Sequence, residues 1–189
     1  MADERRADER LDLGKVVGGI ARRLAEEDYP SGHLAALRRL ESDRPAGAAF
    51  WRLVADYAPA LFDDERGQRV NERDQRVLAA VVRGMAVAHP FHQPLSGRRS
   101  LGTALAEAGV AEARLLRLLR LGRDELPEEL RRLARMIASK GDPGRFDWAD
   151  AAWLLATADG EAGETVRRRI ARDFYRTSYT KQHDEGKAA

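Results

Sequence analysis

The stretch Arg114-Leu-Leu-Arg117-Leu-Leu-Arg120-Leu-Gly-Arg123 decides the fold class of this chain of 189 residues. Its arginines recur every third residue, while Leu115, Leu116, Leu118 and Leu119 are expected to fill the other side of a helix. Such a helix buries one face and offers the other to solvent or to anions. Related patterns recur along the chain without strand alternation or hairpin turns, so the sequence predicts an all-α fold.

A proline-containing connection divides the helical pattern. Pro90 and Pro94 each lack a backbone N–H, so no helix can run through them. We therefore predict a two-part helical bundle. Its expected parts are a disordered tail at residues 1–10, an N-terminal bundle at 11–90, a connecting loop at 91–99, a C-terminal bundle at 100–178 and a flexible tail at 179–189.

Capping residues predict several helix ends. Ser100 and Asp147 are expected to cap helices at their N-termini, and Gly109 is expected to end one in the left-handed conformation. Ser31 is expected to cap a short helix, and Pro45 is expected to open the next one.

The chain is rich in arginine, although its positive and negative charges are nearly balanced. Four of the 33 basic residues are lysines (Lys15, Lys140, Lys181 and Lys187), which leaves 29 arginines. Coding DNA rich in G and C would raise arginine, alanine and glycine together, so composition alone does not indicate a function. With 31 acidic residues the formal net charge is only +2, and the placement of the arginines therefore carries the argument.

Catalytic, metal and targeting signals are missing from the sequence. There is no cysteine, no glycine-rich phosphate loop and no nucleophile elbow, and His89 and His92 lack the spacing of a helical metal pair. No apolar run has the length of a signal peptide or a membrane span. We predict a cytoplasmic protein that is not an enzyme, has no cofactor and no metal site, and does not bind a membrane.

Arginine faces are expected on three helices of the C-terminal half. Beside the opening stretch, these faces carry Arg131, Arg132 and Arg135, and Arg168 and Arg172. Few acidic residues stand at pairing distance from Arg114, Arg117 and Arg120 along their own helix, which favours phosphate contact over a solvated face with intrahelical salt bridges. The tryptophans Trp51, Trp148 and Trp153 sit beside apolar residues, which favours core packing over stacking on bases.

Seven segments occur in an order and spacing that match a known family. They are His33-Leu-Ala-Ala-Leu-Arg38-Arg39, Ala49-Phe-Trp51-Arg-Leu-Val54, Ser100-Leu-Gly-Thr-Ala-Leu-Ala-Glu-Ala-Gly109, Glu112-Ala-Arg114-Leu-Leu-Arg117-Leu-Leu-Arg120, Leu130-Arg-Arg-Leu133, Phe146-Asp-Trp148 and Arg169-Ile-Ala-Arg-Asp-Phe-Tyr-Arg176. From about Lys15 to Arg176 the chain thereby resembles the CasB family, the small subunit of the type I-E CRISPR surveillance complex Cascade.

The resemblance implies a non-catalytic, all-α subunit of an antiviral complex. It implies that two copies help to hold guide RNA and target DNA beside other Cascade subunits, and guide the displaced non-target DNA strand during R-loop formation. Because strand exchange is nearly balanced in energy, modest contacts to the sugar-phosphate backbone can tip it.

The resemblance also implies which arginines contact nucleic acid. These are Arg38, Arg39, Arg98, Arg99, Arg114, Arg120, Arg123, Arg131 and Arg132, and helix geometry adds Arg117, Arg135, Arg168 and Arg172. Their division among RNA, DNA and protein neighbours stays open. Two alternatives stay open as well: a helix-turn-helix regulator that reads duplex DNA, and a protein scaffold whose arginines pair with acidic partners.

Overall fold

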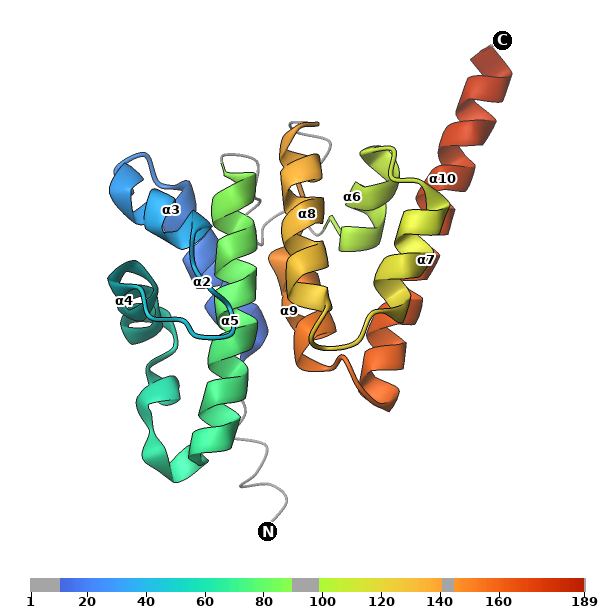
Figure 1. Cartoon of the computed structure of the whole chain (residues 1–189). Coiled ribbons are helices and arrows are strands. Elements are labelled where there is room, and N and C mark those ends of the chain that lie inside the picture. Colours follow the sequence, from blue (N-terminus) through green and yellow to red (C-terminus); the bar gives the residue numbers. More distant parts are fainter. Residues whose placement is uncertain (1–10, 90–98, 141–144, 189) are drawn as a thin grey trace.

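The computed structural model of the chain describes residues 11–89, 99–140 and 145–188 (Figure 1). Within these ranges the regular structure is helical and no strand occurs, which confirms the all-α prediction. The predictions for the tail at 1–10 and for most of the loop at 91–99, Arg98 included, fall outside the described residues.

The helices before the connection surround one long helix. In chain order they are α2 (Leu13–Ala25), α3 (Ser31–Arg38), α4 (Ala48–Tyr57), the 3-10 helices η1 (Pro59–Phe62) and η2 (Asp64–Arg66), and α5 (Gln68–Ala88). The helices after the connection are α6 (Leu101–Glu107), α7 (Glu112–Arg120), α8 (Leu126–Ala138), α9 (Trp148–Ala156) and α10 (Glu161–Ala188).

The two halves meet along α5 and α8, which stand side by side in Figure 1. Helix α9 extends the contact because it packs on both α2 and α5. Residues of both halves are fully buried together, among them Leu78 and Met85 of α5 and Leu154 of α9. The buried apolar side chains form one cluster that runs through both halves, so the two parts share a continuous core.

Three of the predicted helix ends are confirmed. The side chain of Ser100 accepts a hydrogen bond from the N–H of Thr103 at 3.2 Å, and that of Asp147 accepts one from the N–H of Ala149 at 2.9 Å. Gly109 has a φ of 70° and ends α6, as a left-handed residue after the last helical turn does.

The two predicted helix starts in the N-terminal half are wrong. The carbonyl of Pro30 accepts from the N–H groups of His33 and Leu34, so Ser31 already lies inside the first turn of α3 and does not cap it. Helix α4 begins at Ala48, three residues later than Pro45, because the extended Gly47 supplies the first helical carbonyl.

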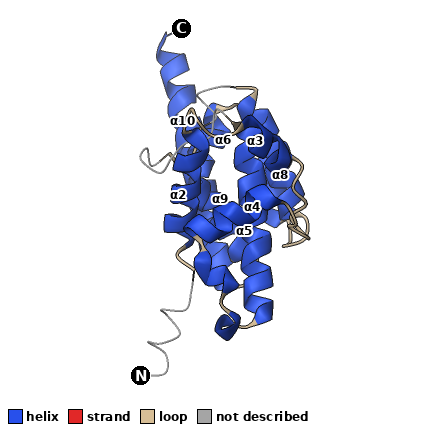
Figure 2. Cartoon of the chain, turned by 90° about the vertical axis from the view of Figure 1, so that its left-hand side faces the viewer, coloured by secondary structure: helices blue, strands red, loops and turns tan. Residues whose placement is uncertain are grey.

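The C-terminal segment 179–189, predicted to be a flexible tail, is helical as far as Ala188. Helix α10 stands out beyond the bundle in Figure 1 and Figure 2. It meets no proline after Arg176, and Lys181 anchors it by donating to the carbonyls of Ala106 and Glu107 at the end of α6. A cation at the C-terminus of a helix is favourable, which explains why the helix continues.

Two apolar side chains are more exposed than the sequence predicted. Leu116 is 36% exposed, although Leu115 and Leu118 of the same helix are fully buried. One residue advances a helix by about 100°, which carries Leu116 off the buried stripe. Trp153 is 39% exposed, whereas Trp148 is 2% exposed and packs in the core as predicted.

Candidate nucleic-acid interface

The predicted arginines that fall within the described residues are spread over both halves. Arg38 ends α3 and Arg39 follows it, Arg99 precedes α6, and the others lie on or beside the C-terminal helices. Those on or beside the C-terminal helices are Arg114, Arg117 and Arg120 on α7, Arg123 in the connection to α8, Arg131, Arg132 and Arg135 on α8, and Arg168 and Arg172 on α10.

Helices α7 and α8 bring several of these arginines together. Leu115 and Leu118 of α7 and Leu126 and Leu130 of α8 are buried, which fixes the two helices on the same core. Pro127 stands in the first turn of α8 with acidic residues behind it, where they suit the positive end of the helix. The first turn of α8 thus supplies Glu129, whose carboxylate faces Arg114 and Arg117 of α7.

Glu129 is the buried acid of this surface. Its side chain is only 3% exposed and lies 3.3 Å from Arg114 Nε, 3.6 Å from Arg117 Nη2 and 3.4 Å from Arg132 Nη1. A buried carboxylate is stable when charged only if cations pair with it. Three guanidinium groups therefore share one negative charge, and the surface above Glu129 keeps an excess of positive charge.

Glu128, the neighbouring acid, serves a second set of arginines. Arg131 donates to it from Nε at 2.9 and 3.1 Å, while Arg132 lies 3.7 Å and Arg83 of α5 lies 3.9 Å away. The hydrogen bond from Arg131 lowers the pKa of Glu128 and raises the pKa of Arg131 itself. Both groups are therefore charged at neutral pH.

We call Arg83, Arg114, Arg117, Arg131 and Arg132 the α7–α8 arginine cluster. Five positive charges face the two negative charges of Glu128 and Glu129, so the cluster has a formal charge of +3. Arg117 is 61% exposed and Arg132 is 51% exposed, whereas Arg131 is only 19% exposed. Arg117 and Arg132 are thus the members that an anion in solvent can reach.

Four predicted arginines pair with no carboxylate among the described residues. They are Arg39, Arg120, Arg135 and Arg168, and each is exposed. Arg120 follows Arg117 on α7 and Arg135 follows Arg132 on α8, so each extends the exposed part of the cluster along its own helix.

The remaining predicted arginines have partners inside the chain. Arg99 pairs with Glu107, Arg123 lies 2.8 Å from Asp159, and Arg172 lies 3.0 Å from Asp173. Arg38 donates from Nε to the carbonyl of Ala86 at 2.9 Å, which fastens α3 to the end of α5.

Arg114 and Arg117 nevertheless have an acidic partner, although few acids stand at pairing distance along their own helix. Their partner Glu129 lies on the next helix, so offsets within one helix could not reveal it. Arg69, Arg76 and Arg83 of α5 were not predicted from the sequence. Their spacing of seven residues places them on one face of that helix and could have indicated them.

The described residues show neither a metal-binding cluster nor a membrane-spanning helix. No group of three or more His, Cys, Asp or Glu side chains suited to a metal ion occurs in the described parts of the chain. Across the same residues, every helix is too short or too polar to cross a bilayer.

The fold and the arginine surface together define an all-helical protein with a cationic face organised by two glutamates. The family model of CRISPR-associated protein Cse2 matches residues 33–175, which is more than half of the chain. The chain belongs to this family, the CasB small subunits of type I-E Cascade, as the resemblance of the sequence indicated.

Comparison with solved structures supports the same fold. The chain is similar to a chain in the crystal structure of E. coli Cascade bound to a PAM-containing double-stranded DNA target, with 23% sequence identity and a TM-score of 0.62. The match covers 86% of this chain and 95% of the other chain. Comparison with curated protein sequences gives no match.

Proposed function

We propose that this chain is a non-catalytic small subunit of a type I-E Cascade complex and binds nucleic acid through the sugar-phosphate backbone. The observation that carries the proposal is the α7–α8 arginine cluster, in which five guanidinium groups share two carboxylates. A guanidinium presents a planar fork of donors that matches phosphate oxygens and stays charged at every physiological pH. Membership of the Cse2 family agrees with this role.

The proposed partners follow from the related structure. That structure is a Cascade complex on a double-stranded DNA target, so we assign to this chain guide RNA, the two DNA strands and other Cascade subunits as partners. The family resemblance adds a second copy of the chain itself. The displaced non-target strand is the ligand that best suits an exposed cationic face, because the backbone of an unpaired strand can follow a positively charged surface. Contacts with it would stabilise the R-loop.

The cluster is suited to contact without regard to base sequence. Arg114 is held on Glu129 and Arg131 on Glu128, so their guanidinium groups are fixed near the protein surface and do not extend like groove-reading side chains. Backbone contacts position a strand and carry no sequence information by themselves. The helix-turn-helix alternative instead requires one preferred duplex sequence.

The test is a double substitution with a matched control. Arg117→Gln with Arg132→Gln removes the two exposed members of the cluster, and Arg22→Gln with Arg23→Gln removes two charges on α2, which supplies no member of the cluster. Fluorescence anisotropy with single-stranded DNA of mixed sequence should show binding at least five-fold weaker for the first variant and nearly unchanged binding for the control.

Other outcomes of this test would contradict the proposal. Equal losses in the two variants would indicate a general charge effect and no dedicated surface. Binding of one duplex sequence far above all single strands would support the helix-turn-helix alternative. Circular dichroism of each variant checks that the helical fold is intact.

A further inference from the structure

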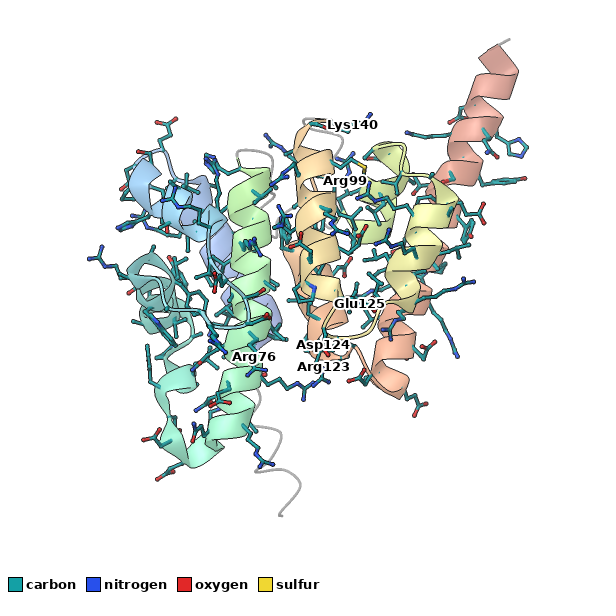
Figure 3. All side chains as sticks on the ribbon, viewed as in Figure 1. Arg76, Arg99, Arg123, Asp124, Glu125 and Lys140 are labelled. Atoms are coloured by element: carbon teal, nitrogen blue, oxygen red, sulfur yellow. The ribbon has the colours of Figure 1, made fainter. Side chains whose placement is uncertain are left out.

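A cavity of about 440 Å³ lies where the two halves of the molecule meet. Helix α5 forms one wall, the connection from α7 to α8 forms the opposite wall, and residues 42–43 close one side. Figure 3 shows Arg76 of α5 on one side of this space and Arg123 and Asp124 on the other. The volume is within the range of about 300–1,000 Å³ typical of small-molecule sites.

The α5 wall of the cavity is rich in arginine. Arg69, Arg73 and Arg76 follow one another at helical spacing and all line the cavity. Arg73 donates to the carbonyl of Ala156, which ties it to α9. Arg69 and Arg76 are exposed and pair with no carboxylate of the described residues, so they are available to an anion.

The cavity also has an apolar floor and carboxylates at its rim. Val77 is 7% exposed and Leu155 is 3% exposed, and both line the floor together with Pro127. Asp43 and Asp124 stand at the rim, and Glu72 lies on the α5 wall, where it accepts a hydrogen bond from Gln68. None of the three forms an ion pair with a cation of the described residues. A free carboxylate repels phosphate but accepts hydrogen bonds from amino and hydroxyl groups.

These three kinds of lining suit one chemical class of ligand. Inorganic phosphate would use the arginines alone and be repelled by the aspartates, and an acidic peptide would meet the same repulsion. A nucleotide has an anionic phosphate, a flat base that packs on apolar surface, and amino or hydroxyl donors. From this match we infer that the cavity binds one unpaired nucleotide.

In this arrangement the phosphate lies on Arg69 and Arg76, the base lies over Val77 and Leu155, and Asp124 accepts from a donor of the base or sugar. The inference rests on the proposed function in one respect, namely that the nucleotide belongs to a strand that the protein already holds. Binding there bridges α5 and the α7–α8 connection, so it joins the two halves.

In the first arm of the test, deoxyadenosine 5′-monophosphate and inorganic phosphate are each titrated into the full chain. NMR chemical shifts measure the binding of each probe. Arg69→Gln with Arg76→Gln should weaken nucleotide binding at least five-fold. Asp43→Asn with Asp124→Asn should weaken nucleotide binding at least three-fold. The same variant should bind inorganic phosphate equally tightly or more tightly. The Arg22→Gln, Arg23→Gln variant serves as the charge control and should change neither.

The aspartate variant is the decisive arm because simple charge attraction predicts the opposite sign. If removing the two negative charges tightens nucleotide binding as well as phosphate binding, the cavity recognises only charge and the inference is overturned. Shifts that map away from α5 and the α7–α8 connection would overturn it equally.

A second arm distinguishes a nucleotide in a strand from a free nucleotide. A single-stranded oligonucleotide should displace the monophosphate, and the same strand with an abasic site should displace it at least three-fold less well. Arg117→Gln with Arg132→Gln should weaken binding of the strand and leave binding of the monophosphate unchanged. If the monophosphate binds but no strand displaces it, the cavity still binds a nucleotide. The claim that this nucleotide belongs to a bound strand would then be wrong.

Discussion

Glu129 is the side chain on which the α7–α8 arginine cluster depends. It is almost fully buried, and Arg114, Arg117 and Arg132 surround its carboxylate. The same carboxylate holds Arg114, which is only 35% exposed, in a fixed orientation. One residue thus lowers the net charge of the surface while keeping its cations in place.

Replacing Glu129 by Gln should separate these two effects. The three arginines lose their shared counter-charge, and we expect a loss of about 2 kcal/mol in the free energy of unfolding, less than a fully buried pair would cost because the arginines reach solvent. Affinity for single-stranded DNA should rise two- to five-fold. Urea denaturation and anisotropy measure the two quantities, and a fall in both would contradict the assigned role of Glu129.

Glu128 gives the cluster a dependence on pH. Its pKa in the folded protein is lowered from an ordinary value of 4.5, chiefly by the hydrogen bond from Arg131. A lowered pKa stabilises the folded state above the ordinary value, and this contribution is lost as the pH falls through the folded pKa. The effect is modest because the side chain is 41% exposed.

We therefore expect Glu128→Gln to be less stable than the native chain at pH 7. The difference should shrink steadily as the pH is lowered below 4.5, because protonation then removes the charge from the native residue as well. Urea denaturation of both proteins across that range measures the difference. A difference that does not vary with pH would show that the ionised carboxylate is not the cause.

Helices α6 and α10 pack closely against each other at Gly102. A Cβ atom placed on Gly102 would lie 2.1 Å from the carbonyl oxygen of Ile170 and 2.9 Å from the N of Phe174. These are backbone atoms and cannot move aside as a flexible side chain does. The contact sets the position of α10, and with it the positions of Arg168 and Arg172.

Gly102→Ala should consequently force α6 and α10 apart. We expect a loss of about 3 kcal/mol in the free energy of unfolding, the upper end of the usual cost of overpacking. Gly32→Ala is the matched control, because a Cβ there meets nothing within 4 Å and alanine favours a helix by up to about 1 kcal/mol. Equal stability of the two variants in thermal denaturation would contradict the close approach.

The helices were predictable from the sequence because each carries its own apolar stripe and capping residues. Ser100, Gly109 and Asp147 act locally, so their roles could be inferred from the residues beside them. The partners of the arginines were not predictable in this way. Glu129 reaches α7 from α8, and the cavity forms only when α5 meets the α7–α8 connection, so both depend on tertiary packing.

The whole molecule has a small net charge, so its attraction to a polyanion must come from where charges lie. The formal charge is +2 over 189 residues, yet the α7–α8 arginine cluster alone has a formal charge of +3. The shared core holds α5 against α8 and so brings Arg83 to the four arginines of α7 and α8. The cationic surface is thus a consequence of how the halves pack.

The salt dependence of single-stranded DNA binding tests this account most directly. Each phosphate contact releases condensed counterions, and the logarithm of affinity falls against the logarithm of salt concentration with a slope of about −0.7 per contact. The Arg117→Gln, Arg132→Gln variant should therefore have a slope shallower by about 1.4 than the native chain, while the control on α2 keeps the native slope. Identical slopes for all three proteins would show that the cluster does not contact phosphates.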